Sequence, residues 1–420
     1  MKRFTAEVIS ACICCSLCLT SCSSVRIIHE EPSCEITYSW WGKDDRNEST
    51  LEGLKIFGEQ HEDISVRTEY GEYEGFKSRM NCEIYSGTEA DVMQLNYDWL
   101  YEYSPDGTGF YDLSELSDHI DLSNFAKEDL QYGIIGGRLN ALPISLNALT
   151  FAYNKTLYDS YGLKLPSTWE ELFSAAKVMS KDGVYPLELT EKSIWMCCCA
   201  YLEQTTGKPA LKNGFDLTDE DLKIMIDFCC RLLNEKVTPP GADYDRSDIS
   251  LLKAAGTVSW ISDIGYFSNE AETGGFELEI GDYITADDYI SYGWYIKPSS
   301  LYAIKKDCGD PEAAAELMDF LLNSPDMAAV QGRTRGIPVS CSAAETLDAR
   351  DMLGGTEFEA AQKMNSDPQL KKMSPYIENA DIIDVFNDVC ESVYYSKATS
   401  EQAAADAVSR MEEIMNALEK

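Results

Sequence analysis

Aromatic and hydrogen-bonding side chains follow several strand-like segments of this 420-residue chain. Trp40 and Trp41 end the segment that begins at Ile36, and Trp260 follows the segment at residues 256–259. Ligands of open α/β sheets bind beyond the carboxyl ends of the strands, so a ligand is expected near these positions. A sugar needs flat aromatic faces for its C–H surfaces and polar side chains for its hydroxyls. The pattern therefore favours carbohydrate binding.

The candidate ligand-binding residues lie just after a strand, at a chain crossing or in a late turn. They are Trp41, Lys43, Arg46, Gln94, Asn96, Trp99, Ser145, Asn147, Trp260, Asp263, Trp294 and Arg335. Nine of them also have a structural interpretation: the tryptophans as core residues, the asparagines and Asp263 as turn or cap residues, and the two arginines as surface ion pairs. Successive side chains of a strand point to opposite faces, so Trp40 and Trp41 lie on different faces of the sheet. Trp40 is therefore either a core residue or part of the site.

The cationic candidates Lys43, Arg46 and Arg335 allow a second ligand class, an acidic oligosaccharide such as a uronide. A guanidinium holds a carboxylate through two parallel hydrogen bonds. A neutral glycan is the alternative, and the net charge of −37 favours it. The local potential in a cleft can nevertheless oppose the sign of the whole chain.

The elements that position these residues alternate between strand-like and helix-like segments. Strands are expected at residues 36–40, 64–67 and 90–95, with a helix between the first two, and nearly continuous apolar strands joined by helices indicate a parallel sheet covered on both faces. Residues 141–147 resemble an extended crossing into a second alternating region, so the fold class is α/β with two lobes. Thr168 with Glu171 forms a capping-box pattern, and Asp310 before Pro311 predicts another helix start.

The first residues predict export and lipid attachment. Lys2 and Arg3 precede an apolar stretch at residues 8–19 that is too short to span a bilayer permanently, and LTSC at residues 19–22 is typical of a bacterial lipoprotein signal. We expect a signal peptide at residues 1–21, lipid on Cys22 and a polar tether at residues 22–33. The predicted location is the extracytoplasmic face of the cell membrane; the competing interpretation of the apolar stretch is a buried helix.

The composition argues against nucleic acid and anionic lipid headgroups as partners. With 72 acidic and 35 basic residues, the chain lacks the clustered cations that bind nucleic acid, and anionic headgroups would repel it. The lipid anchor is therefore the expected membrane contact. A hydrophobic share of 44% over this length supports a large core in two lobes.

No motif indicates a metal, cofactor or catalytic centre. Of 15 cysteines, ten lie beyond Cys22, and those at residues 197–199 and 229–230 stand in apolar helical context as expected for core residues. Asp243, Asp245 and Asp248 fit a solvated turn better than a calcium loop. The competing enzyme class is a secreted glycosidase with two carboxylates, but abundant acidic residues make candidate pairs uninformative. We expect a protein that is not an enzyme.

Several motifs in a fixed order resemble one family. They are ITYSWWGKDD at residues 36–45, GTEADVMQ at 87–94, GRLNALP at 137–143, YNK at 153–155, LPSTWEEL at 165–172 and GIPV at 336–339. Together with the lipoprotein signal, this set is similar to the extracellular solute-binding proteins, family 1, of carbohydrate-importing ABC transporters. Residues 94–113 are also similar to oligogalacturonide-binding members.

The resemblance implies a two-lobed, type II periplasmic-binding-protein-like fold, each lobe a mainly parallel sheet flanked by helices and joined by hinge crossings. One lobe is expected at residues 34–145 and about 296–345, and the other at residues 146–295 and about 346–420. The implied function is capture of a mono- or oligosaccharide between the lobes by a monomer and its delivery to ABC permease subunits. A surface sugar sensor that signals through a receptor is the alternative.

Overall fold

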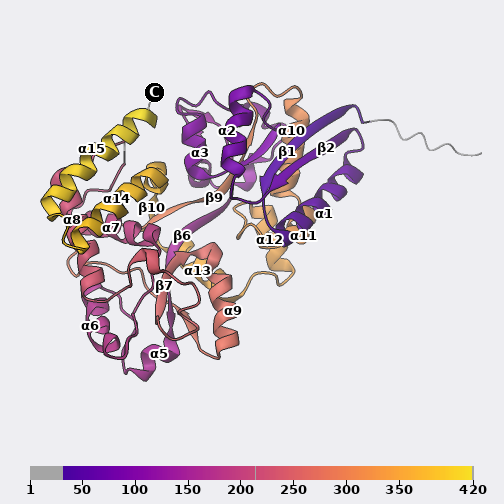
Figure 1. Ribbon diagram of the computed structural model, residues 1–420. Helices are drawn as coiled ribbons and strands as arrows, with labels where there is room; N and C mark the ends of the chain where they lie inside the picture. Colours follow the sequence, from indigo (N-terminus) through magenta and orange to yellow (C-terminus); the bar gives the residue numbers. More distant parts are fainter. Residues whose placement is uncertain (1–31, 213, 419–420) are drawn as a thin grey trace, which may run out of the picture.

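The computed structural model describes residues 32–212 and 214–418, which form two lobes joined by long strands (Figure 1). The predicted signal peptide, Cys22 and almost all of the tether lie outside the described residues. Within the described residues, no helix combines the length and the apolar character needed to cross a membrane.

The first lobe contains the early strands and the helices around them. Its early elements are β1 (Cys34–Trp41), α1 (Asp44–Gln60), β2 (Ile64–Gly71), α2 (Phe76–Ser86), β3 (Val92–Leu95), α3 (Tyr97–Tyr103), α4 (Lys127–Leu130), β4 (Ile134–Ile135) and β5 (Arg138–Leu139). Later in the chain, α10 (Pro311–Asn323), α11 (Pro325–Gln331) and α12 (Cys341–Ala349) return to pack against this group.

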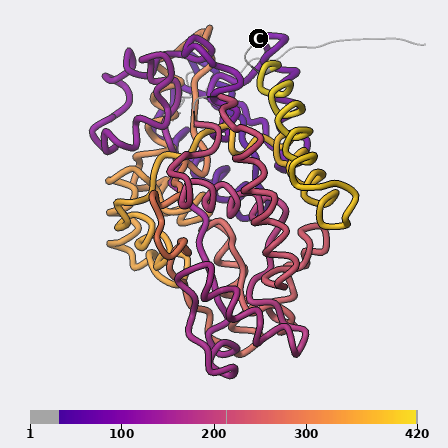
Figure 2. The backbone as a smooth tube through the Cα atoms, turned by 90° about the vertical axis from the view of Figure 1, so that its left-hand side faces the viewer, coloured from indigo at the N-terminus to yellow at the C-terminus, as the bar shows by residue number. Residues whose placement is uncertain are grey.

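The second lobe follows the strand β6 (Leu142–Asn154). Its elements are α5 (Lys155–Ser160), α6 (Trp169–Met179), α7 (Glu191–Thr206), α8 (Asp219–Asn234), β7 (Gly256–Trp260), α9 (Ile264–Gly274), β8 (Leu278–Ile280), α13 (Gly355–Ser366), β10 (Lys371–Lys372), α14 (Ala380–Tyr394) and α15 (Ser400–Leu418). The C-terminal helix α15 packs against α8 and α14 along one side of this lobe (Figure 2).

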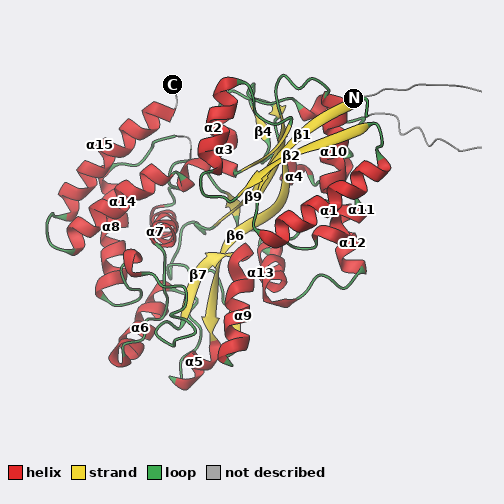
Figure 3. Ribbon diagram, turned by 45° about the vertical axis from the view of Figure 1, so that its right-hand side comes forward, coloured by secondary structure: helices red, strands yellow, loops and turns green. Residues whose placement is uncertain are grey.

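The sheet is mixed and continues from one lobe into the other. Its strand order is β2-β1-β3-β9-β6-β7, where β9 spans Tyr295–Ile304, and helices flank it (Figure 3). Parallel pairing is confirmed for β1 with β2 and β3. By contrast β9 runs antiparallel to β3 and β6, and β7 and β8 run antiparallel to β6. The two long strands are antiparallel because one carries the chain out of the first lobe and the other brings it back.

The hinge region lies where β6 and β9 pass between the lobes. The pairing register shifts on both sides of Ser145, which also forms a bridge with Pro338 of the late GIPV turn. Irregular pairing weakens the ladder locally and permits bending. The predicted crossing at residues 141–147 is therefore confirmed, and the GIPV turn lies directly against it.

Local sequence signals explain the element boundaries. Thr168 accepts a hydrogen bond from the Glu171 amide as predicted, but the Glu171 carboxylate reaches the amide of Ser167. Asp310 caps α10 ahead of Pro311, as predicted. The cysteines at residues 197–199 and 229–230 are buried in the core, where they pack as small apolar side chains.

Candidate ligand-binding site

An aromatic wall forms the first-lobe side of the candidate site. Trp41 ends β1, Trp99 lies on α3, and Tyr73 comes from the loop after β2; their ring centroids are 5.3 to 5.9 Å apart. Trp41 is 8% exposed and Tyr73 is 54% exposed, whereas Trp99 is buried behind them. A hollow of about 540 Å³ lies here. It is lined by Trp41, Gly42, Lys43, Asp44, Asp45, Arg46, Tyr73 and Thr334.

Trp260 forms the facing wall on the second lobe. It ends β7, is half-buried, and lines a hollow of about 200 Å³ together with Lys192 and Asp263. The Nζ atoms of Lys192 and Lys297 lie 5.5 and 4.6 Å from the centre of its ring. Such cation–π contacts fix the orientation of the indole. Asp263 is half-buried, and its carboxylate lies 3.6 Å from the Arg246 guanidinium.

A charged floor connects the two walls; it consists of Asp98, Lys192, Lys297 and Glu378. Lys297 Nζ lies 2.5 Å from a carboxylate oxygen of Glu378, and Lys192 binds the other oxygen. Burial opposes ionisation of Glu378, but the two lysines outweigh it and lower its pKa to about 2. Burial and the neighbouring Glu378 raise the pKa of Asp98 to about 6.

Tyr73 links this floor to the first aromatic wall. Burial raises the pKa of Tyr73 to about 12, and the charges of Asp98 and Glu378 act in the same direction. Because the same two carboxylates act on Tyr73 and the lysines beside them contact Trp260, the floor lies between the aromatic walls. The arrangement offers an aromatic face from each lobe and hydrogen-bonding groups below them, as a sugar requires.

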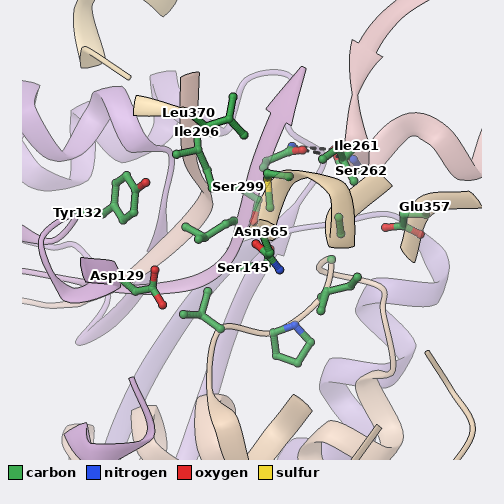
Figure 4. Close-up of a pocket in the computed structure, with 18 of the residues that line it drawn as sticks. Asp129, Tyr132, Ser145, Ile261, Ser262, Ile296, Ser299, Glu357, Asn365 and Leu370 are labelled. Carbon is green, nitrogen blue, oxygen red and sulfur yellow. Dashed lines mark hydrogen bonds between the residues drawn. The ribbon is translucent and has the colours of Figure 1, made fainter. Parts of the chain in front are cut away.

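Ser145 and Asn147 line a different hollow, of about 400 Å³, shown in Figure 4. Ile296 of β9 also lines this hollow. The next residue, Lys297, contacts the Trp260 ring on the other face of β9. Successive side chains of a strand point to opposite faces, so this hollow lies behind the crossing strands. The Asn147 amide donates to Ser262 Oγ at 3.0 Å, and Ser145 binds Ser299 and the Arg335 carbonyl.

Gln94 and Arg335 are buried together beside the first wall. The Arg335 guanidinium donates to Gln94 Oε1 at 2.6 Å and to Thr50 Oγ1 at 3.0 Å. Thr50 in turn donates to the Arg46 carbonyl at 2.6 Å. Only Arg46 of these lines the hollow directly.

The remaining candidates stand further back. Trp294 is 2% exposed, and its indole N–H donates to the Ile284 carbonyl at 2.8 Å, so it supports the site from the core behind Trp260. Asn96 is half-buried at the start of α3 and donates to Asp98 at 2.6 Å. Trp40 is fully buried and stacks on Tyr38 and Tyr70.

Five residues of the site were not among the sequence candidates: Tyr73, Asp98, Lys192, Lys297 and Glu378. Tyr73 and Glu378 lie in loops or short turns without strand alternation, and Lys192 lies in the first turn of α7. Two signals were available: Asp98 closely follows the end of β3, and Lys297 is a charged residue within an apolar strand. In the described residues no group of His, Cys, Asp or Glu side chains is arranged to hold a metal ion.

Two lobes, antiparallel crossings and facing aromatic walls define a two-lobed binding protein. Residues 54–413 match the family of bacterial extracellular solute-binding proteins. The chain belongs to this family, and the family's location is outside the cytoplasm.

Solved structures agree with this assignment. The chain is 29% identical to a periplasmic oligogalacturonide-binding protein from Yersinia enterocolitica, solved with saturated digalacturonic acid; the TM-score is 0.82, with 92% of this chain and 100% of that chain covered. It is 28% identical to a periplasmic solute-binding protein from Pectobacterium atrosepticum, with a TM-score of 0.86 and coverage of 92% and 100%. It is also 28% identical to the de novo designed cysteine esterase ECH19, with a TM-score of 0.85 and coverage of 93% and 100%.

Proposed function

We propose that this protein captures a carbohydrate between its lobes and delivers it to the permease subunits of an ABC importer. The observation that carries the proposal is the facing pair of aromatic walls, Trp41 with Tyr73 on one lobe and Trp260 on the other. In this proposal the protein acts as a monomer held on the extracytoplasmic membrane face by lipid on Cys22. We also propose the lobe boundaries expected from the sequence, residues 34–145 with about 296–345 and residues 146–295 with about 346–420.

The Yersinia relative supports a carbohydrate ligand because it binds a sugar acid and covers nearly all of this chain. Closure must depend on contacts with both lobes, since only an interaction that differs between open and closed forms can shift their populations. Trp260 and the first aromatic wall meet this requirement because they belong to different lobes.

We also propose that the site binds without catalysis. Two carboxylates with separated pKa values, Asp98 and Glu378, are the signature of a glycosidase acid and nucleophile. Glu378, however, is held by two lysines, and its side chain is only 3% exposed. A carboxylate so enclosed has no path to a sugar carbon, which favours a structural and electrostatic role.

Isothermal titration calorimetry with a panel of neutral and acidic mono- and oligosaccharides tests the proposed function. We predict that Trp260→Ala weakens binding of the best ligand at least tenfold, since burying a large apolar side chain contributes about 1.5–3 kcal/mol and a factor of ten corresponds to about 1.4 kcal/mol. Circular dichroism should show an unchanged fold. Chromatography of the ligand after incubation should recover it intact.

Tyr395→Ala is the matched control, because Tyr395 is an exposed aromatic residue at the end of α14. It should leave the affinity unchanged. Equal affinities of the Trp260 variant and the wild type would remove Trp260 from the site. Absence of binding across the panel would overturn the proposed function, and hydrolysed products would replace it with the glycosidase.

A further inference from the structure

Two arginines near the first aromatic wall have no acidic partner among the described residues. Arg46 donates through Nε and Nη2 to the Thr334 carbonyl at 3.0 and 2.8 Å. Arg335, only 3% exposed, binds the neutral side chains of Gln94 and Thr50, and its Nε has no partner. Both positive charges are therefore stabilised by neutral groups alone.

This absence is unusual in a chain with 72 acidic and 35 basic residues. Seven of the eight other arginines of the described residues form ion pairs with carboxylates, and the eighth, Arg350, is exposed to solvent. The seven are Arg67, Arg79, Arg138, Arg231, Arg246, Arg333 and Arg410. Removing a charge from water costs free energy unless an opposite charge compensates it. The two unpaired guanidiniums thus create a local positive potential in a strongly acidic protein.

The two charges also act on each other. Burial, and after it the positive charge of Arg335, lower the pKa of Arg46 to about 10. The remaining groups that act on Arg46 are the hydroxyls of Tyr38 and Tyr302, with no carboxylate among them. An anion placed beside Arg46 would relieve this repulsion and the cost of burial together.

Arg46 faces the hollow of about 540 Å³ that Trp41 and Tyr73 line. Its third nitrogen, Nη1, donates to no group among the described residues. The hollow also lies at the start of the 17-residue helix α1, whose first turn has no side-chain cap. Free amides and the positive end of the helix dipole add to the attraction for an anion. Asp44 and Asp45 also line the hollow, but both residues are exposed, and solvent weakens the interaction of exposed charges with a ligand.

We propose that this hollow binds the carboxylate of an acidic sugar, with Arg46 as the direct ligand and Arg335 as the buried charge behind it. The proposal rests on the proposed function and names its substrate class: oligosaccharides that contain uronic acid. A planar carboxylate matches the guanidinium and neighbouring amides, while the sugar ring stacks on the exposed Tyr73.

Calorimetry with matched ligands tests the proposal. The panel contains di- and trisaccharides of galacturonic, glucuronic and mannuronic acid, their methyl esters, and the corresponding neutral sugars. We expect the tightest ligand to be a free acid, bound at least tenfold more tightly than its own ester. Arg46→Gln should weaken binding of that acid at least tenfold and change the affinity for the ester less than threefold.

Arg67→Gln is the matched control, since it removes the same charge from an exposed position on β2 of the same lobe. It should retain the preference for the acid. If a neutral sugar or ester binds as tightly as the acid, this inference is overturned while the proposed function stands. If no member of this panel or the neutral panel binds, the proposed function fails as well. The comparison of acid and ester on the wild type keeps the test valid if Arg46→Gln does not fold.

Discussion

Glu378 compensates the positive charges of two lysines in the proposed site. Its carboxylate bridges Lys192 and Lys297, and the same lysines contact the ring of Trp260. Because Lys297 is almost fully buried, its charge is tolerated only while Glu378 is ionised. One carboxylate therefore fixes two cations and, through them, the orientation of an indole in the proposed site.

Glu378→Gln should lower the free energy of unfolding by about 3 kcal/mol at pH 7, because it leaves two cations without their partner. The folded-state pKa of about 2 lies below the ordinary glutamate value of about 4.3. The stabilisation is therefore complete above about pH 5 and is lost as the pH falls toward 2. Urea denaturation at pH 7 and pH 3 measures both effects.

Glu391→Gln is the control for this substitution, since Glu391 is exposed on α14 and lies 3.7 Å from the equally exposed Lys397. Exposed ion pairs contribute about 0–1 kcal/mol, so this variant should resemble the wild type. A loss for Glu378→Gln no larger than that of Glu391→Gln would show that the floor contributes nothing to folding.

The late GIPV turn controls how β6 passes between the lobes. Gly336 has φ +86°, and a Cβ there would lie 2.7 Å from Ser145 Oγ, at the point where the register of β6 shifts. The Ser145 hydroxyl also donates to the neighbouring Arg335 carbonyl at 2.6 Å. A glycine is required at this position for both its backbone conformation and its lack of a side chain.

Gly336→Ala should lower the free energy of unfolding by about 1–3 kcal/mol through backbone strain and the contact with Ser145. Gly58→Ala in α1 is the matched control, because no atom lies within 4 Å of its added Cβ. That variant should be stabilised by about 0.5–1 kcal/mol, as expected for alanine in a helix interior. Chemical denaturation of both variants checks the difference, and equal effects would contradict the assigned role of the turn.

The sequence predicted the early strands, the crossing and several helix starts because these depend on local periodicity and capping. It did not predict the antiparallel pairing of β9, which joins Gln94 of β3 to Ser300 far along the chain. Burial was equally hard to predict. The sequence around Trp294 does not distinguish it from Trp260, yet Trp294 packs against Trp169 and Phe151 in the core. Local signals locate the end of a strand, whereas long-range packing decides which side chains stay open to a ligand.

The proposed function depends on motion of two lobes about the crossing strands. The described residues already hold contacts between the lobes: Lys372 Nζ donates to the Gln131 carbonyl at 2.7 Å and lies over the Tyr132 ring at 5.4 Å. A ligand that touches both Trp260 and the first aromatic wall adds further contacts of this kind. Its binding energy is then available to favour the closed form.

Saturation with the best ligand should therefore reduce the radius of gyration measured by small-angle X-ray scattering. A non-binding sugar at the same concentration provides the control, because it changes the solvent but makes no contact with either lobe. Trp260→Ala, titrated to saturation, should close less completely than the wild type, since its bound ligand has lost the aromatic contact on one lobe. If calorimetry shows full occupancy while the wild-type scattering stays that of the free protein, the ligand is held without lobe closure, and delivery by a closed form is wrong.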